Sequence, residues 1–371
     1  MEKEDFSDRL IGIRGARGSG KTTMMLQYAR STGLPVTKML YLSCDHPAMA
    51  GESLLALAQS FYQEGGKLLI LDEIHKARHF GAELKAIYDT FDLQVIFSGS
   101  SALQMSNMNA DLSRRGVLFH LPVLSLREYI EIETGLTLPS VTLQNLIEQH
   151  QEVGFELTQK FRPIEYFKKY CESGAYPFYQ ESIDNYPLKL LEVINHTIDV
   201  DVPVLFKVDA SKLDQLKKVL YMLCATPPVE LNKAKISGAV GLSWPALSKY
   251  LDAMQAADLI FSLRGGAGMR AVNKPNKLLL NNPNLFKVLC ASPNVGSVRE
   301  SFFVSQVSQH HQVHYHDQGD FMVDDTLVFE VGGAGKKENQ IKSQPNAYLA
   351  LDDVEMGALK SIPLWMFGFL Y

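Results

Sequence analysis

Residues 15–22, with the sequence GARGSGKT, match the phosphate-binding pattern GxxxxGK[ST] at every fixed position. An apolar run at 10–13 precedes them, and Met24, Met25 and Tyr28 follow at helical spacing. The loop is therefore expected between a strand and the first turn of a helix, where backbone N–H groups can surround phosphate oxygens. A surface glycine turn is the alternative, but this context favours a nucleoside triphosphate site.

Each part of the loop has an expected role. The glycines leave room for phosphate, Lys21 reaches the β and γ phosphates, and the Thr22 hydroxyl binds Mg²⁺. The predicted nucleotide-binding residues of this segment are Gly15, Ala16, Arg17, Gly18, Ser19, Gly20, Lys21, Thr22 and Thr23.

Two carboxylates follow a second apolar run. Residues 67–71 have the composition of a buried parallel strand, and Asp72 and Glu73 come at its end. We expect Asp72 to hold Mg²⁺ and Glu73 to act as the general base that orients the attacking water. A solvated acidic loop is the alternative.

A third apolar run, at 94–97, ends in Ser98. This hydroxyl is a candidate sensor of the γ phosphate or the water, although Ser-Gly is also an ordinary turn signal. Two further runs, at 38–43 and 117–121, supply the remaining strands. Strands alternating with helical segments predict an open, doubly wound α/β sheet with its ligand beyond the carboxyl ends of the strands.

The order of these motifs resembles the AAA+ P-loop ATPases, in particular predicted bacterial and archaeal members with a C-terminal domain of uncharacterised function. The matching segments are the loop at 15–22, LDEIHK at 71–76, FSGSSA at 97–102 and LPVLSLREYI at 121–130. The resemblance implies an ATPase that uses ATP and Mg²⁺. It also implies that Arg114 or, as we prefer, Arg115 is an arginine finger for a neighbouring subunit in a homo-oligomer or with a partner protein. A surface arginine in an ion pair is the alternative.

The same resemblance suggests a helical lid after the ATPase core. In the segment YCESGAYPFYQ, Gly174 and Pro177 are similar to the lid element that contacts adenine, so Pro177 is a further predicted nucleotide-binding residue. Gly and Pro also mark ordinary turns. We expect an ATPase core at 1–130 and a lid at 131–208.

Residues 209–275 resemble a winged helix-turn-helix. Helical patterns at 213–223 and 233–240 precede a third helix after Ser243, and a glycine-rich turn could form the wing. Lys249, Arg264 and Arg270 could touch DNA phosphates, but this basic surface is small, and many winged helices bind proteins instead.

Residues 276–371 resemble the PD-(D/E)xK nuclease fold. Glu300 on a helix, Asp320 at a hairpin and Glu330 on the next strand match its three metal-binding acids. The lysine expected two residues after the last acid is replaced by Gly332. We therefore expect a small α/β domain with a degenerate nuclease site, in which Lys336 or Lys337 is the only substitute for the lysine.

Four histidines, His310, His311, His314 and His316, crowd this segment, but exposed histidines on an edge strand are favoured over a metal site. Composition is ordinary for a globular protein, at 46% hydrophobic and 21% charged residues, and a net charge of -5 argues against a general attraction to nucleic acid. No run approaches the roughly 18 apolar residues of a membrane helix, so no membrane partner is expected.

The four cysteines have no metal or redox spacing, and no signal peptide pattern is present. We interpret the cysteines as free thiols of a cytoplasmic protein. Three functions stay open: an ATP-hydrolysing switch coupled to a C-terminal interaction module, a non-catalytic nucleotide-dependent DNA regulator, and an ATP-gated metal-dependent nuclease.

Overall fold

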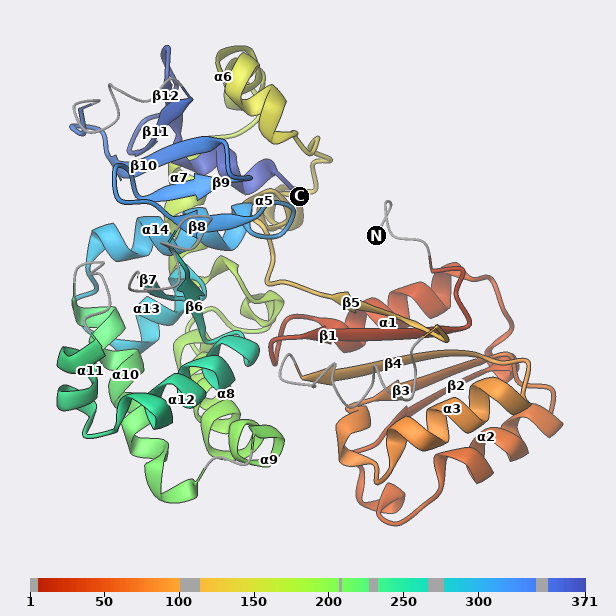
Figure 1. Cartoon of the computed structure of the whole chain (residues 1–371). Coiled ribbons are helices and arrows are strands. Elements are labelled where there is room, and N and C mark those ends of the chain that lie inside the picture. Colours follow the sequence, from red (N-terminus) through yellow and green to blue (C-terminus); the bar gives the residue numbers. More distant parts are fainter. Residues whose placement is uncertain (1–5, 101–113, 207–208, 227–232, 266–276, 338–345) are drawn as a thin grey trace. The chain divides into compact units, whose positions relative to one another are not determined.

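The computed structural model describes residues 6–100, 114–206, 209–226, 233–265, 277–337 and 346–371 (Figure 1). The chain forms two compact units. We call Met1–Val123 with Val204–Lys207 the N-terminal unit, and Leu124–Pro203 with Val208–Tyr371 the C-terminal unit. The four predicted domains stay a prediction, since the structure groups the predicted lid helices with the C-terminal segments.

The N-terminal unit contains a sheet of five parallel strands in the order β2-β3-β4-β1-β5, as its sequence predicts. The strands are β1 (Leu10–Gly15), β2 (Met39–Ser43), β3 (Leu68–Asp72), β4 (Gln94–Ser100) and β5 (Val117–His120). The helices and short turns between them are α1 (Lys21–Ser31), η1 (Val36–Lys38), η2 (Pro47–Met49), α2 (Leu54–Gln63), η3 (Ile74–Lys76) and α3 (Phe80–Thr90).

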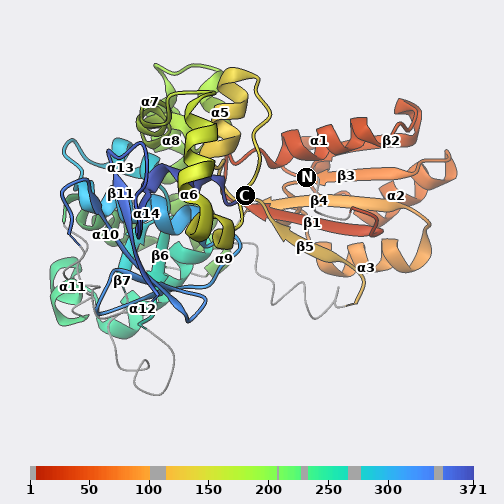
Figure 2. The same cartoon turned by 90° about the horizontal axis from the view of Figure 1, so that it is seen from above.

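Helices cover both faces of this sheet (Figure 2). On one face, Ile13 and Ile70 pack with Met25 of α1. On the other, Leu71 packs in a cluster with Leu54 of α2 and further side chains of α3. Strand residues therefore alternate between two apolar layers, which explains why these strands are hydrophobic along their whole length.

The parallel register brings the motifs to one edge. Gly15, the last residue of β1, is paired with the end of β4, and Asp72, the last residue of β3, is paired with Ser43 of β2. Because all five strands run in the same direction, the phosphate loop and the carboxylates leave the sheet at its carboxyl edge.

The C-terminal unit begins with a helical region, which includes helices in the segment 131–208 where the sequence predicts a helical lid. The helices of this region are α5 (Leu126–Thr134), α6 (Leu143–Thr158), α7 (Pro163–Lys169), η4 (Tyr170–Gly174), η5 (Pro177–Gln180), α8 (Tyr186–His196), η6 (Thr197–Asp201) and η7 (Ala210–Lys212). A further helix, α9 (Val202–Phe206), begins in this unit, and its residues from Val204 onward are assigned to the N-terminal unit. Ser125 and Glu128 form a capping box that starts α5.

Three helices and an antiparallel strand pair follow. They are α10 (Leu213–Ala225), α11 (Lys233–Val240), α12 (Trp244–Ala256), β6 (Ile260–Leu263) and β7 (Lys277–Leu280). The helices lie where the sequence predicts them, but the winged-helix assignment stays a prediction. The predicted wing, with Arg270, lies outside the described residues.

The last part of the unit is a second five-stranded sheet in the order β12-β11-β10-β9-β8. Its elements, with the flanking helices, are α13 (Pro283–Leu289), α14 (Val295–Val307), β8 (Val313–Tyr315), β9 (Phe321–Val323), β10 (Leu327–Gly333), β11 (Ala347–Asp352), β12 (Ser361–Pro363) and η10 (Leu364–Phe369). Strands β8, β9 and β10 are antiparallel, whereas β10, β11 and β12 are parallel.

Helix α14 lies in the centre of this part. Every residue from 300 to 307 is buried, and Phe303 contacts the rings of Phe321, Phe329 and Phe367 with centroids 4.9–5.4 Å apart. These rings come from β9, β10 and η10, so α14 has protein on all of its sides along these residues.

The interpretation of all four cysteines as free thiols is wrong for two of them. Cys224 at the end of α10 and Cys290 after α13 form a disulfide with their Cα atoms 6.2 Å apart. Helices α10 and α13 pack together, which brings together cysteines that are 66 residues apart in the sequence. Cys44 and Cys171 are free.

Among the residues that the structure describes, none of the helices combines the length and the apolar character that a membrane-crossing segment requires.

Candidate functional site

The phosphate loop begins where β1 ends. A Cβ atom on Gly15 would lie 2.3 Å from the carbonyl oxygen of Leu121, so only glycine fits there. Gly18 and Gly20 have φ values of 81° and 98°, in the left-handed region that glycine adopts without strain. Gly20 is the N-cap of α1 and offers no side-chain cap, so the first N–H groups of the helix remain directed at a ligand.

Two buried side chains of the loop suit a phosphate. Lys21 is 6% exposed, and its Nζ donates to the carbonyl oxygens of Gly15 and Ala16 at 2.9 Å each. Ser19 is buried, and within the described residues its Oγ has no hydrogen-bond partner. A buried hydroxyl without a partner is costly, and a phosphate oxygen would supply one.

Asp72 is the centre of a hydrogen-bond network at the end of β3. Its Oδ2 accepts from the Thr22 hydroxyl at 2.6 Å and from the Tyr41 hydroxyl at 3.0 Å. Its Oδ1 accepts from the Ser98 hydroxyl and from the Glu73 backbone N–H, the latter at 3.1 Å. Thr22 and Asp72 thus place two oxygen ligands side by side, and oxygen ligands are what Mg²⁺ prefers.

The sequence analysis missed Tyr41. Its phenol comes from β2, and burial together with the charge of Asp72 raises the pKa of Tyr41 to about 12. The hydroxyl therefore keeps its proton at neutral pH and donates it to the carboxylate. A tyrosine inside an apolar strand two residues before its end is a weak signal, because most such tyrosines only fill a core.

Glu73 follows Asp72 in an unusual backbone conformation. Its backbone is left-handed, with φ 52°, and its N–H also donates to Ser98 Oγ at 3.1 Å. A left-handed non-glycine residue costs of the order of 1 kcal/mol and persists where its surroundings hold it. The Glu73 carboxylate lies 3.4 Å from Nδ1 of the buried His75, so His75 contacts the predicted base.

Ser98 lies behind the carboxylates. It is fully buried, donates to Asp72 and accepts from the Glu73 N–H. These contacts connect β4 to both acids. The sensor role predicted for Ser98 stays a prediction.

Arg115 is held within its own chain. Its Nε and Nη2 bind the two carboxylate oxygens of Asp89, at the end of α3, at 2.9 and 3.1 Å. This double hydrogen bond raises the pKa of Arg115. Arg114 has a left-handed backbone, with φ 71°. The arginine-finger role stays a prediction, and residues 111–113 of the same motif lie outside the described residues.

Pro177 begins the short helix η5 in the C-terminal unit. The neighbouring Ala175 N–H donates to Asn284 Oδ1 at 2.8 Å, and Tyr176 receives a hydrogen bond from Asn282 at 3.1 Å. These buried contacts fix the segment on α13. The adenine contact of Pro177 stays a prediction.

The three acids of the predicted nuclease site converge. Glu300 lies on α14, Asp320 immediately precedes β9, and Glu330 lies on β10. Asp320 Oδ2 accepts from the Val331 N–H at 2.8 Å, which holds its carboxylate over β10. Burial raises the pKa of Glu300 to about 8 and also raises the pKa of Glu330, with the charge of Asp320 adding to both shifts.

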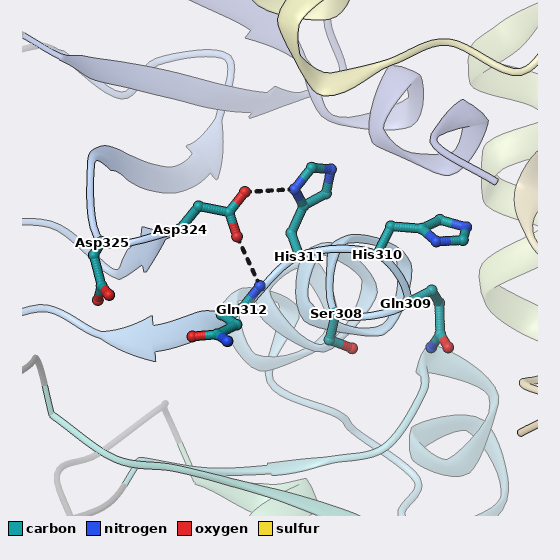
Figure 3. Close-up of a pocket in the computed structure, with 7 residues that line it drawn as sticks. All are labelled: Ser308, Gln309, His310, His311, Gln312, Asp324 and Asp325. Carbon is teal, nitrogen blue, oxygen red and sulfur yellow. Dashed lines mark hydrogen bonds and ion pairs between the residues drawn. The ribbon is translucent and has the colours of Figure 1, made fainter.

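A separate surface hollow of about 670 Å³ lies beside part of the predicted histidine cluster (Figure 3). His311 Nδ1 lies 2.6 Å from Asp324 Oδ2, and the Gln312 N–H donates to Asp324 Oδ1 at 2.9 Å. Asp324 therefore joins the two sides of the hollow. Across the described ranges, no group of three or more His, Cys, Asp or Glu side chains is arranged to hold a metal.

Two family models match parts of the chain. Residues 7–130 match an AAA domain, and residues 164–292 match a domain of unknown function, DUF8612. Together with the loop and the parallel sheet, the first match shows that this part of the chain has the fold of an AAA-type P-loop ATPase. The second match carries no activity with it.

An uncharacterized protein of Methanocaldococcus jannaschii is 28% identical over 294 residues, which are 74% of this chain. The match spans 61% of that relative's length. Among solved structures, AMPPCP-bound DnaA from Aquifex aeolicus is similar at 15% identity, over 68% of this chain and 88% of that chain, with a TM-score of 0.26. Likeness at this level supports no statement about function.

Proposed function

We propose that this protein is an ATPase switch, which binds and slowly hydrolyses Mg-ATP and passes its nucleotide state to a C-terminal interaction module. The contact that carries the proposal is the 2.6 Å hydrogen bond between Thr22 and Asp72. It joins the phosphate loop to the carboxylate strand at the point where a nucleotide-bound Mg²⁺ must lie.

The residues have separate roles in this proposal. Thr22 and Asp72 would hold Mg²⁺, which would neutralise charge on the β and γ phosphates. Lys21 exchanges its bonds to loop carbonyls for phosphate oxygens. Tyr41 and Ser98 keep the Asp72 carboxylate in place through their hydroxyls. Glu73 accepts a proton from the attacking water.

Phosphate release and nucleotide binding test this assignment. Glu73→Gln should bind ATP as the wild type does and lose about 10²–10⁴-fold in turnover, because only the general base is lost. Lys21→Ala should bind ATP at least tenfold more weakly. Glu64→Gln and Lys85→Ala are matched controls, since both residues are exposed in the same unit. Equal rates in all five proteins contradict the proposal.

The proposed active form is a homo-oligomer, or a complex with a partner subunit, in which Arg115 of one subunit reaches the γ phosphate of the next. Arg115 must then exchange Asp89 for the phosphate. Mixing Arg115→Ala with Glu73→Gln protein tests this, because a mixed interface combines an intact Glu73 with an intact Arg115. Recovered phosphate release in the mixture supports action in trans, and rates that merely add contradict it.

A second candidate is a non-catalytic, nucleotide-dependent DNA regulator. It is favoured by the helix order of α10–α12 and by the exposure of Lys249 on α12 and Arg264 after β6. Fluorescence anisotropy of a labelled DNA duplex, with and without ATP, separates the candidates. ATP-dependent DNA binding with negligible hydrolysis identifies the regulator.

The third candidate, an ATP-gated nuclease, requires Mg²⁺-dependent DNA cleavage that Asp320→Ala abolishes. We expect no cleavage. For the ATPase switch and for the DNA regulator we propose a location in the cytoplasm, with ATP as the ligand.

A further inference from the structure

The carboxylate cluster of the C-terminal unit, Glu300, Asp320 and Glu330, contains a cation that belongs to the chain itself. Lys277, the first residue of β7, directs its ammonium between two of the acids. Its Nζ lies 2.6 Å from Glu300 Oε2 and 3.5 Å from Asp320 Oδ1. At these distances the ammonium occupies the place that a metal shared by the two carboxylates would need.

The surroundings of Lys277 are closed to water. Lys277 is 4% exposed and Glu300 is 6% exposed. The Nζ also lies 4.7 Å from the ring centroid of Phe321 and 5.6 Å from that of Tyr315. Aromatic faces attract a cation, and most strongly when it is desolvated, so the rings and the carboxylates hold the ammonium from several directions.

Other partners engage two further oxygens of the acids. Asp320 Oδ2 accepts from the Val331 N–H at 2.8 Å, and Glu330 Oε1 lies 2.5 Å from Lys336 Nζ. A divalent cation at the cluster would therefore have to displace at least one ammonium. The PD-(D/E)xK resemblance implies Mg²⁺ at these acids, and the residues present do not fit it in this arrangement.

The side chain of Lys336 packs against Gly332. A Cβ atom on Gly332 would lie 2.7 Å from Lys336 Cδ and 3.0 Å from its Cβ and Cγ. The stem of Lys336 thus covers the position from which a lysine at 332 would extend, and its Nζ reaches Glu330. The cluster holds three acids and two lysines, so most of its negative charge is neutralised from within the chain.

We propose that Lys277 is a built-in counter-cation, which fills the cation position between Glu300 and Asp320 and so keeps this carboxylate cluster free of divalent metal. The cluster is then a latent metal site, and loss of the ammonium opens it. This inference concerns the C-terminal unit alone and is independent of the proposed ATPase function.

Mn²⁺ binding to the full chain without nucleotide tests the proposal. Free Mn²⁺ is measured by electron paramagnetic resonance during titration, so that any contribution from Asp72 is equal in all proteins. The Lys277→Met protein should bind one more Mn²⁺ per chain than the wild type does. The affinity for this extra ion should be at least tenfold higher than the affinity of the wild-type cluster for Mn²⁺. Lys277→Met/Asp320→Asn should lose this extra ion.

Two controls separate the local effect from the change in net charge. Lys287→Met removes an exposed lysine that pairs with Glu172, outside the cluster, and should gain no Mn²⁺. Lys277→Arg keeps the positive charge and should also stay without the extra ion.

Two results overturn the proposal. One is a Lys277→Met protein that keeps its native tryptophan fluorescence and binds no additional Mn²⁺. The other is a wild type that loses one Mn²⁺ on Asp320→Asn substitution. If the Lys277→Met protein does not fold, the comparison of wild type with Asp320→Asn decides alone. With Lys277 in place, these two proteins should bind the same amount of Mn²⁺.

Discussion

Lys21 and Lys277 are both almost fully buried, at 6% and 4% exposure, but they bind different kinds of group. Lys21 donates to two backbone carbonyls of its own loop, whereas Lys277 pairs with two carboxylates. Carbonyls carry no net charge, so the positive charge of Lys21 is not neutralised by these bonds. The charge of Lys277 is neutralised by its neighbours.

The acids differ in the same way. Asp72 takes hydrogen bonds from two hydroxyls on one oxygen, and neutral donors leave its negative charge available to a metal. Glu300 faces an ammonium instead. In the N-terminal unit, neutral partners keep the charges of Lys21 and Asp72 available to a ligand, whereas the charges of Lys277 and its acids meet directly.

The largest expected difference between the two regions is in stability. Lys277→Met should lower the free energy of unfolding of the C-terminal unit by about 3 kcal/mol above about pH 8, where Glu300 is ionised and would be left without its partner. Lys21→Met should lower that of the N-terminal unit by only about 1 kcal/mol.

Urea unfolding resolves the two effects. Both tryptophans of the chain, Trp244 and Trp365, belong to the C-terminal unit, so their fluorescence follows that unit, while circular dichroism follows both. Equal losses of unfolding free energy for Lys277→Met and Lys21→Met would contradict the expected difference between the two lysines.

The next effect is a pH dependence confined to the C-terminal unit. The pKa of Glu300 rises from 4.5 to about 8 on folding, so the folded state holds one more proton between these values. Its contribution to stability is complete below about pH 4.5 and is lost as the pH rises through 8, by about 2 kcal/mol between pH 6 and pH 8. Glu300→Gln cannot titrate and should remove this loss.

The measurement is the difference between wild type and Glu300→Gln in tryptophan-detected unfolding at each pH, which cancels the titration of other groups. A difference that stays constant from pH 5 to pH 8 contradicts the assignment.

A smaller effect is expected at Tyr41. Tyr41→Phe removes one of the donors to Asp72 and should cost about 1 kcal/mol, which raises the Mg²⁺ concentration for half-maximal ATP turnover about fivefold. Maximal turnover at saturating Mg²⁺ should change little. The measurement is the Mg²⁺ dependence of phosphate release, and a lowered maximum with unchanged Mg²⁺ dependence would place Tyr41 in the chemical step instead.

The smallest effect on stability is expected from the ion pair of Arg115. Asp89→Asn should leave the free energy of unfolding almost unchanged, because the pair lies at the surface, where ion pairs contribute little. It should nevertheless raise phosphate release at low protein concentration, since Arg115 no longer has to leave Asp89. Reduced release would show that the pair holds Arg115 in its active position.

The sequence predicted which segments of the N-terminal unit meet at one edge, because each segment is contiguous and follows a strand. The loop at 15–22 and the pair Asp72–Glu73 leave the same edge once the strands are parallel, so the hydrogen bond between Thr22 and Asp72 follows from the topology. Tyr41 was missed because its role depends on the register of β2 against β3.

For the C-terminal cluster, the sequence predicted the three acids but not Lys277. Lys277 begins a strand of a different sheet, 23 residues before Glu300 in the sequence, and no local pattern connects the two. The prediction of free thiols at Cys224 and Cys290 was wrong for the same reason, because their disulfide depends on how α10 packs on α13. Long-range packing, rather than local propensity, decides these contacts.

Helix α14, buried without interruption from residue 300 to 307, also sets how slowly the cluster can open. Backbone amides that never reach solvent by local fraying exchange their hydrogens only when the whole cooperative unit unfolds. The amides of 300–307 should therefore be among the last of the C-terminal unit to exchange in deuterium. The backbone at Glu300 is then released only on global unfolding, and any faster exchange of a cation at the cluster must come from motion of side chains.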